Sequence, residues 1–290
     1  MGSFFKAMLQ KFVPQKVWKT LRERKILKQH RRVASICEML IEDYRRKGVE
    51  MDFRPVQTFP NEKIIWQYWA QGYDNVPELV AACLQSVDKY CSDYMVVRLS
   101  DDNLCDYLEI PEWLEEKRRS YSVAFFSDLL RTLLLSVYGG VWLDATVMLS
   151  APLPAEYANQ DFFVFQRDPQ ENHIAYWEGT YAYYFCWSKG FRVNMLSSFM
   201  VAKKDNKLIR TLCGLMLKWW RENDCLPDYF FYQILFDVLI HEGGMGDDNC
   251  AIVSDCLPHY LQQCLHDPKF VLMSKEEILA QIPIHKLTYK

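Results

Sequence analysis

Two aspartates and an arginine in the middle of this 290-residue chain have the types and spacing of a binding site. Asp128 and Arg131 are three positions apart, so both side chains lie on the same face of a predicted helix. Asp144 follows a short apolar run, and Thr146 stands two positions after it. An arginine presents a planar fork of N–H donors that fixes the orientation of a bound group. Carboxylate oxygens accept hydrogen bonds and are the ligands that hard divalent cations prefer.

The surrounding elements indicate how these side chains would be positioned. Apolar residues recur at helical spacing on the opposite face of the predicted helix, at Phe126, Leu130, Leu133 and Val137. Gly139 and Gly140 end that helix, because glycine accepts the left-handed conformation that a C-terminal cap requires. Residues 141–143 are apolar and favour a buried strand. Asp144 is therefore predicted at the carboxyl end of a strand, where open α/β sheets bind ligands.

Each of these features taken alone has a more ordinary interpretation. An aspartate and an arginine three positions apart on a helix usually form a solvated ion pair worth a few tenths of a kcal/mol. An aspartate that follows a strand is often a helix cap or a turn residue. The joint arrangement is more specific than either feature.

The combined pattern resembles the sugar-nucleotide-binding core of capsular polysaccharide synthesis proteins related to glycosyltransferase family 32. It is similar, more distantly, to family 8 galactosyltransferases and to the glucosylating clostridial toxins. These groups share S-D-x-x-R, then Y-G-G, a hydrophobic strand and D-x-D. The corresponding residues here are Ser127, Asp128, Arg131, Tyr138, Gly139, Gly140, Asp144 and Thr146. Segments 63–69, 199–204, 228–230 and 284–290 also agree, so the resemblance extends over residues 60–290.

The resemblance implies an α/β fold of the GT-A type, which is a Rossmann-like mixed sheet flanked by helices. It also implies a retaining glycosyltransferase that takes a hexose, galactose or glucose, from a UDP-sugar. Asp128 and Arg131 would bind the donor sugar and help to hold the nucleotide, and Asp144 would contact the ribose and the sugar. Lys286 would meet the diphosphate, and Asp228 would contact the donor sugar or the acceptor. The nucleotide base would lie against the strand that carries Ile65, Trp66 and Gln67, although Trp66 also fits an ordinary core position.

The chain departs from the family pattern at Thr146, which replaces the second aspartate of D-x-D. A threonine hydroxyl is a weak neutral ligand, whereas hard cations prefer anionic oxygens. By resemblance to family 8, a histidine near the C-terminus would complete a metal site, and His285 stands in that segment. The expected cofactor is therefore Mn²⁺ or Mg²⁺, held by Asp144, Thr146 and His285. A lone histidine near a chain end is, however, more often an ordinary surface residue.

Positive charge is concentrated at the N-terminus. Residues 1–48 carry 13 Lys and Arg against 4 Asp and Glu, a net charge of +9, whereas the whole chain carries −3. Apolar side chains alternate with lysines at the start of this segment, which favours a basic amphipathic helix on an anionic membrane surface. The alternative is a helical extension that packs on the catalytic domain. Nucleic acid is disfavoured as a partner, because the acidic remainder of the chain would repel it.

The pattern divides the chain into a basic helical N-terminal extension with a linker, residues 1–59, and a catalytic domain, residues 60–290. Alternating strands and helices predict a nucleotide-binding α/β unit in the first half. Helices are expected at 15–47, 77–90, 111–119, 206–222 and 229–242, and strands at 64–69, 94–99, 162–166, 182–187 and 197–202. Residues 243–249 are expected to form a loop.

The predicted function is hexose transfer from a UDP-sugar to a lipid-linked oligosaccharide in capsular or surface polysaccharide synthesis. Two alternatives stay open: a transferase with a protein or small-molecule acceptor, and a non-catalytic protein that binds sugar nucleotides. No apolar run approaches the ~20 residues of a membrane span. There is no secretory signal pattern, and the ten cysteines form no C-x-x-C pair. These features predict a cytoplasmic protein with reduced thiols, peripheral on the inner face of the membrane.

Overall fold

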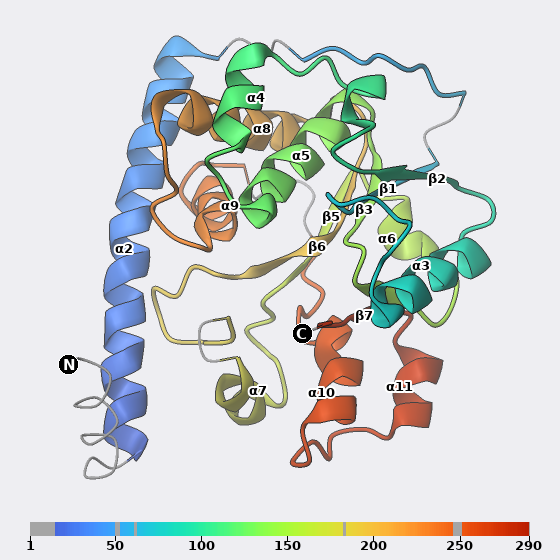
Figure 1. The fold of residues 1–290 in the computed structure, drawn as a ribbon. Helices are drawn as coiled ribbons and strands as arrows, with labels where there is room; N and C mark the ends of the chain where they lie inside the picture. The colour runs from blue at the N-terminus through green and yellow to red at the C-terminus, as the bar shows by residue number, and fades with distance from the viewer. Residues whose placement is uncertain (1–14, 50–52, 61–62, 182–183, 246–250, 290) are drawn as a thin grey trace.

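The computed structural model describes residues 15–49, 53–60, 63–181, 184–245 and 251–289. A five-stranded sheet lies at its centre, with the strand order β2-β1-β3-β6-β5 (Figure 1). Strands β2, β1 and β3 are parallel, while β6 pairs antiparallel with both β3 and β5. The five strands are β1 (Ile64–Tyr68), β2 (Met95–Leu99), β3 (Gly140–Leu143), β5 (Phe162–Gln166) and β6 (Met195–Ala202). A separate antiparallel pair is formed by β4 (Val147–Leu149) and β7 (Ile284–Lys286).

Helices cover both faces of the central sheet. One face packs against α5 (Val123–Val137), α8 (Lys207–Glu222) and α9 (Phe231–His241). The other face packs against α3 (Glu78–Tyr90), α6 (Ala155–Ala158) and the β4–β7 pair. The other helices are α2 (Gln15–Lys47), α4 (Glu112–Arg118), α7 (Ile174–Thr180), α10 (Tyr260–His266) and α11 (Lys275–Gln281), with 3₁₀ turns at Leu104–Asp106 and Leu257–His259. The predicted fold class, a Rossmann-like mixed sheet flanked by helices, is confirmed.

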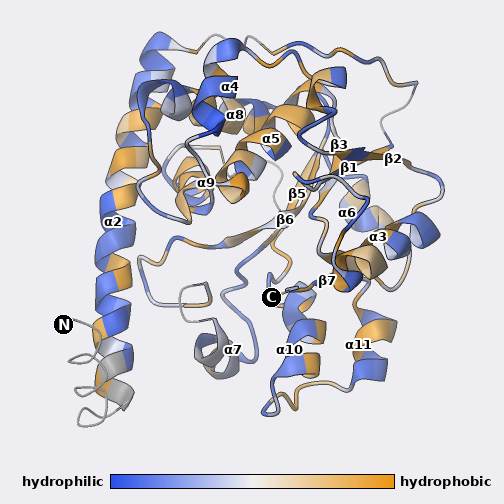
Figure 2. Cartoon of the chain, in the orientation of Figure 1, coloured by the Kyte–Doolittle hydropathy of each residue, from blue (hydrophilic) through white to orange (hydrophobic). Residues whose placement is uncertain are grey.

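Alternation along the strands sends large apolar side chains to both faces of the sheet. Trp66, Trp142 and Met200 face the cluster formed with α5, α8 and α9. Val141 and Val201 face the opposite cluster, which contains residues of α3 and β4. Figure 2 shows hydrophobic residues gathered on the elements around the sheet and long hydrophilic stretches on α2. Burial of the sheet on both faces explains why its strands read as nearly continuous apolar runs.

Two consecutive glycines join α5 to β3 and bring β3 against β1. Gly139 and Gly140 have φ angles of 74° and 101°, a region that other residues rarely adopt. A Cβ atom at Gly140 would lie 2.6 Å from the carbonyl oxygen of Ile64, so the close approach of the two strands also requires glycine. The predicted C-terminal end of this helix is confirmed.

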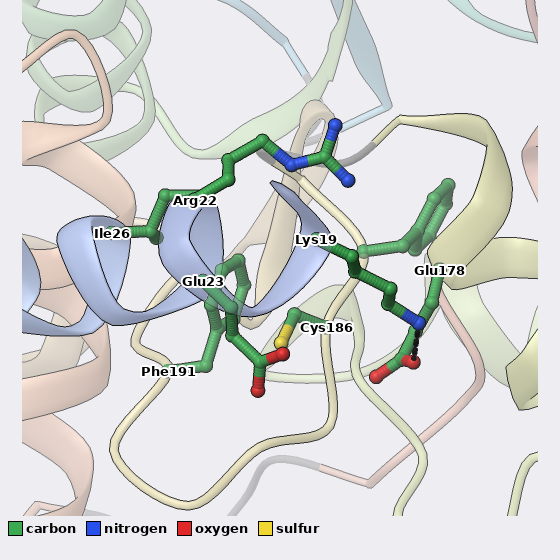
Figure 3. Close-up of a pocket in the computed structure, with 8 residues that line it drawn as sticks. Lys19, Arg22, Glu23, Ile26, Glu178, Cys186 and Phe191 are labelled. Carbon is green, nitrogen blue, oxygen red and sulfur yellow. Dashed lines mark hydrogen bonds and ion pairs between the residues drawn. The ribbon is translucent and has the colours of Figure 1, made fainter. Parts of the chain in front are cut away.

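Helix α2 packs on the body of the protein. Its apolar side chains lie in the same core cluster as the sheet and α8 and α9, and they are Val33, Ala34, Cys37, Leu40 and Ile41. Tyr44 packs so closely on α8 that a Cβ atom at Gly214 would lie 2.6 Å from its ring. Near the other end of α2, Lys19 pairs with Glu178 at 2.9 Å (Figure 3). Glu23 accepts a hydrogen bond from Ser188. The predicted boundary at residue 60 therefore does not separate two cores.

One predicted element is wrong. Residues 184–187, part of the strand expected at 182–187, form a turn and a loop. The Tyr184 N–H donates to the Tyr181 carbonyl at 2.7 Å, a turn contact that a strand does not make. The aromatic side chains that suggested a strand pack instead around a buried arginine. Residues 1–14, 182–183 and 246–250 lie outside the described residues, and with them the start of the predicted amphipathic helix and most of the predicted 243–249 loop.

Candidate functional site

A cavity of about 640 Å³ opens at the carboxyl ends of β1 and β3, the place predicted for a ligand. Its volume lies within the range typical of small-molecule sites. Five predicted site residues line it, and they are Asp128, Arg131, Asp144, Thr146 and Lys286. The cavity therefore brings together side chains from α5, from the end of β3 and from β7.

Asp128 and Arg131 lie on α5 and are almost fully buried. Ser122 caps the start of this helix by accepting a hydrogen bond from the Phe125 N–H. Asp128 is 7% exposed and Arg131 is 4% exposed, and their side chains approach to 3.4 Å. A solvated surface pair would be exposed, so that ordinary interpretation of the two residues is wrong.

The Arg131 guanidinium is held by protein groups on all sides. Its Nε and Nη2 atoms donate to the carbonyl and hydroxyl of Ser127 at 3.1 and 3.0 Å, and Nη1 donates to the Ser197 carbonyl at 2.6 Å. Nη2 also lies 3.5 Å from a carboxylate oxygen of Asp144. Since these contacts occupy most of its five N–H donors, Arg131 acts chiefly by fixing the two carboxylates.

Asp144 is the centre of the charge network. Trp142 Nε1 donates to one of its carboxylate oxygens at 2.8 Å, and Lys286 Nζ lies 3.0 Å from the other. Burial acts to raise the pKa of Asp144, but Lys286 and Arg131 outweigh it and hold the pKa below its ordinary value. Asp144 is therefore ionised at neutral pH, with two cations beside it.

Asp128 has the opposite environment. Burial raises its pKa to about 6, and the negative charge of Asp144 acts in the same direction. Arg131 lowers the pKa but does not cancel these effects. Two neighbouring carboxylates thus titrate in different pH ranges, a feature of residues gathered in functional sites.

Lys286 reaches the site through the pairing of β7 with β4. Lys286 faces Val147 in the register of this pair, and the following Leu287 N–H donates to the Thr146 carbonyl at 3.0 Å. The Lys286 ammonium donates to Asp144 and to the Thr146 hydroxyl. An ammonium has three N–H donors, so a third remains for a ligand in the cavity.

The predicted metal ligands are not assembled. His285 is fully buried and does not line the cavity; its Nε2 lies 3.0 Å from the Ser150 hydroxyl. Neighbouring positions of a strand point to opposite faces, so Lys286 faces Asp144 while His285 faces away. Burial lowers the pKa of His285 to about 4, which keeps the ring neutral. Thr146 is engaged by Lys286.

This set of donors does not fit a divalent cation. Mn²⁺ and Mg²⁺ require several oxygen ligands of negative or partly negative character. The oxygens of Asp144 and Thr146 instead face the positive charges of Lys286 and Arg131. Within the described ranges, no group of three His, Cys, Asp or Glu side chains could hold a metal ion.

The residues predicted to contact the nucleotide base lie beneath the cavity instead of in its wall. Ile65, Trp66 and Gln67 are fully buried. Trp66 Nε1 donates to the Gly139 carbonyl at 2.9 Å, so Trp66 is a core residue. The cavity is lined instead by the residues that follow along the chain, Tyr68, Trp69, Ala70 and Gln71. The rule that ligands bind beyond the carboxyl ends of strands points to these residues.

Asp228 lies beside the cavity, in the segment that precedes α9. Its two carboxylate oxygens accept hydrogen bonds from Gln29 Nε2 at 3.1 Å and from the Phe230 N–H at 2.9 Å. It does not line the cavity, although Tyr229 and Phe230, the next two residues, do. Asp228 therefore connects helix α2 to the wall of the site.

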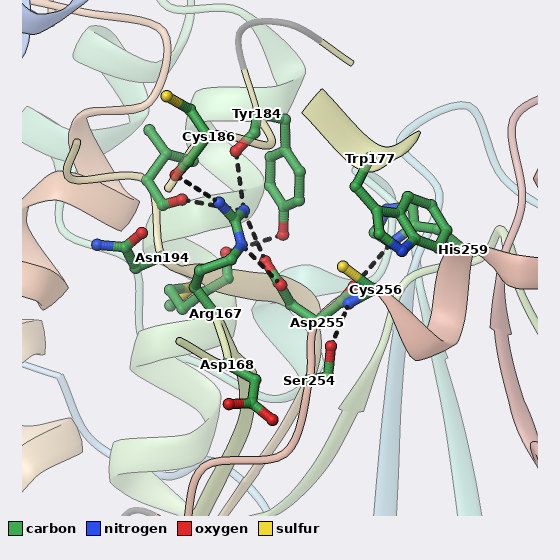
Figure 4. A network of polar contacts seen from close by, with 12 residues as sticks. Arg167, Asp168, Trp177, Tyr184, Cys186, Asn194, Ser254, Asp255, Cys256 and His259 are labelled. Carbon is green, nitrogen blue, oxygen red and sulfur yellow. Dashed lines mark hydrogen bonds and ion pairs between the residues drawn. The ribbon is translucent and has the colours of Figure 1, made fainter. Parts of the chain in front are cut away.

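A buried arginine supports another part of the wall. Arg167 pairs with Asp255 through two contacts of 2.9 Å and donates to the carbonyls of Tyr184 and Cys186 (Figure 4). Aromatic rings surround its guanidinium, including that of Trp187 at 4.6 Å. Tyr184 lines the cavity, so this network fixes part of the cavity wall. Sequence reasoning missed it, because Arg167 and Asp255 are far apart in the chain.

The chain belongs to the capsular polysaccharide synthesis protein family, which it matches over residues 15–290. The resemblance expected from the sequence is confirmed. The match includes α2, which packs into the core.

Similarity to individual proteins is weaker. The chain is 23% identical over 176 residues to the O-glycosyltransferase PaGT of Phomopsis amygdali, a match that covers 57% of this chain and 40% of PaGT. The chain thus spans less than half the length of this relative. Among solved structures, it resembles the PaToxG glycosyltransferase with a TM-score of 0.38 and 13% identity, over 78% of this chain and 82% of that one. It also resembles a glycosyltransferase involved in glycosylation of the PBCV-1 major capsid, with a TM-score of 0.33 and 13% identity, over 66% of this chain and 81% of that one.

Proposed function

We propose that this protein is a glycosyltransferase that transfers a hexose from a UDP-sugar to a saccharide acceptor. The observation that carries the proposal is the partly buried charge network that lines the cavity, formed by Asp128, Arg131, Asp144 and Lys286. Family membership and the relation to PaGT support transferase chemistry. A carboxylate floor can accept hydrogen bonds from sugar and ribose hydroxyls, while an adjacent ammonium can meet a phosphate.

In this proposal each side chain has a separate task. Asp128 and Asp144 accept hydrogen bonds from donor hydroxyls, and Arg131 holds the two carboxylates in place. Lys286 meets the diphosphate and stabilises the negative charge that develops as it leaves. We propose that Lys286, and not Mn²⁺ or Mg²⁺ at Asp144 and Thr146, supplies this charge, because the donors at that position do not fit a cation.

The proposed reaction retains the configuration at the anomeric carbon. The acceptor hydroxyl attacks the face from which the diphosphate leaves, and its proton passes to a phosphate oxygen of the leaving group. Such a reaction needs no separate catalytic base. Asp228 is therefore not needed as a base. In this proposal it positions the wall of the site through its hydrogen bonds with Gln29 and Phe230.

The proposed acceptor is a lipid-linked oligosaccharide, reached by a protein that lies on the anionic inner surface of the membrane. The net charge of +9 in residues 1–48 supports this placement. Among the described residues, no helix is both long and apolar enough to cross a membrane. A protein or small-molecule acceptor is the alternative, and PaGT is named as an O-glycosyltransferase.

The decisive experiment measures nucleotide release from a panel of UDP- and GDP-sugars. We expect release from one UDP-hexose, and at least a 100-fold loss in Asp144→Asn, which keeps the shape of the side chain and removes its charge. Circular dichroism and thermal unfolding check that the variant is folded. Equal release by wild type and variant would refute the site assignment, while binding of a donor without release, in the presence of candidate acceptors, would favour a sugar-nucleotide-binding protein.

A further inference from the structure

A second cavity, of about 420 Å³, adjoins the first between α2 and the segment that leads into α9. Its lining comes from two parts of the chain, Arg22, Lys25, Ile26, Gln29 and His30 on α2 and Asp228, Tyr229 and Phe230 before α9. Tyr229 and Phe230 line both cavities. A ligand in the second cavity would therefore lie next to the donor site.

The second cavity has a fixed polar frame. Gln29 Nε2 donates to the Pro227 carbonyl and to Asp228, each at 3.1 Å, which ties α2 to the opposite wall. The backbone N–H of Arg192 donates to His30 Nδ1 at 3.1 Å, and burial lowers the pKa of His30. Asp228 is occupied by the Gln29 and Phe230 contacts. The groups that remain for a ligand are those of Arg22 and Lys25.

Arg22 and Lys25 bring two positive charges to this cavity, against the one negative charge of Asp228. They lie three positions apart on one face of α2, and both are exposed. No acidic side chain pairs with either of them in the part of the chain that the structure describes. Figure 3 shows the Arg22 side chain pointing away from the paired Lys19 and Glu178. Two unpaired cations on one wall favour an anionic group, and both side chains are suited to phosphate.

The shared wall favours a saccharide. Tyr229 is 64% exposed, and its ring centroid lies 5.9 Å from that of Phe125, which lines the donor cavity. An exposed tyrosine offers an apolar ring face to the C–H surface of a sugar and a hydroxyl for hydrogen bonds. Because Tyr229 lines both cavities, a sugar that packs on its ring would lie next to the donor site.

We infer that the second cavity is the acceptor site and that it takes a saccharide carrying a phosphate or diphosphate group. The sugar packs on Tyr229 and Phe230 and presents its hydroxyl to the donor site, and the phosphate pairs with Arg22 and Lys25. The inference rests on the proposed function, whose acceptor class it specifies.

The test compares binding of three probes to the full-length protein by calorimetry. The probes are lactose, lactose 1-phosphate and a short-chain polyprenyl diphosphate-linked lactose. We expect both phosphorylated probes to bind at least tenfold more tightly than lactose. The double variant Arg22→Ala/Lys25→Ala should lose this preference. Stronger binding of the polyprenyl probe than of lactose 1-phosphate would identify a lipid-linked acceptor. Equal binding of the two phosphorylated probes would identify a soluble acceptor.

The matched control is Arg24→Ala/Arg31→Ala, which removes two exposed cations from the opposite face of the same helix. It should keep the preference for phosphorylated probes. Equal binding of lactose and lactose 1-phosphate, or an unchanged preference in Arg22→Ala/Lys25→Ala, would overturn the inference. Nucleotide release without acceptor should be unchanged in Arg24→Ala/Arg31→Ala. Absence of release from every donor would defeat the proposed function, while calorimetry would still decide the second cavity.

Discussion

Asp128 and Asp144 show how two identical side chains acquire different properties in one site. Lys286 Nζ lies 3.0 Å and Arg131 Nη2 lies 3.5 Å from the Asp144 carboxylate. These two positive charges keep Asp144 ionised although burial disfavours its charged form. Asp128 has one neighbouring cation, the Arg131 guanidinium at 3.4 Å, and its side chain is less exposed than that of Asp144. Burial therefore dominates, and the pKa of Asp128 rises to about 6. The charged form of Asp128 therefore costs the folded state free energy at neutral pH.

This cost predicts that Asp128→Asn stabilises the fold as it inactivates the protein. The wild-type folded state holds a proton on Asp128 up to about pH 6, whereas the unfolded state loses it near pH 4. The stability that the protonated Asp128 side chain contributes is thus present at low pH and is lost as pH rises through 6. The gain from Asp128→Asn should grow by about 1–2 kcal/mol between pH 5 and pH 7.5.

Urea unfolding at both pH values measures this change, with Asp88→Asn, an exposed carboxylate, as the control. A gain that does not depend on pH would show that Asp128 is not the titrating group. We also expect nucleotide release by the wild type to fall below pH 6, as the Asp128 carboxylate becomes protonated and loses an acceptor.

Lys286 is the residue on which the proposed role of charge depends. Lys286→Ala should lower nucleotide release by about 100- to 1,000-fold, the range observed when one preorganised donor to a developing charge is removed. Release by the wild type should persist in EDTA. A 100-fold fall of nucleotide release in EDTA, reversed by added Mn²⁺, would contradict this proposal. It would show that a cation binds at Asp144 and Thr146.

At the scale of elements, the α5–β3 unit holds three of the four site charges. The turn at Gly139 and Gly140 sets the direction of β3 and lets it lie against β1. Asp144 leaves the end of β3, with its N–H donating to the Ser198 carbonyl at 2.9 Å. The geometry of the carboxylates therefore depends on a turn remote from the cavity.

We predict that Gly140→Ala destabilises the protein by about 2–4 kcal/mol, because it combines an unfavourable φ with overlap on Ile64. Gly190→Ala is the matched control, since Gly190 also has a positive φ, 90°, but nothing lies within 4 Å of its Cβ position. That substitution should cost about 1 kcal/mol. Chemical denaturation of the two variants measures the difference, and equal losses would show that strand contact at Gly140 contributes nothing.

At the scale of the whole molecule, α2 links the basic N-terminus to the site. Its apolar face completes the core, while Gln29 connects it to Asp228 and the shared wall. Deleting residues 1–48 would remove core side chains, so it cannot test membrane binding separately from folding.

Deletion of residues 1–14 is the better test, because it leaves every described element in place. This segment carries Lys6 and Lys11 together with several large apolar residues. Each basic residue near an anionic surface contributes about 1 kcal/mol, so we expect at least a tenfold loss of binding to phosphatidylglycerol vesicles. Vesicles of phosphatidylcholine serve as the control, and unchanged binding after the deletion would refute the membrane proposal.

The sequence by itself determined the α5–β3 part of the site. Asp128 and Arg131 share a helix face at a spacing of three, and Asp144 ends the strand that follows, so only local geometry was needed. Most of the helices and strands follow from apolar periodicity in the same way. The loop at 184–187 was missed because its aromatic residues pack around Arg167, a contact that periodicity does not encode.

Only the tertiary structure decided which distant side chains join the site. Adjacent residues of a strand point to opposite faces, so either His285 or Lys286 could face Asp144, and the register of β7 with β4 selects Lys286. The β1 residues 64–68 are all buried, so alternation could not show which of them reach the cavity. The second cavity arises where α2 meets a segment almost 200 positions away, as in the Gln29–Asp228 contact. Such pairings depend on the packing of whole elements, which local sequence patterns do not specify.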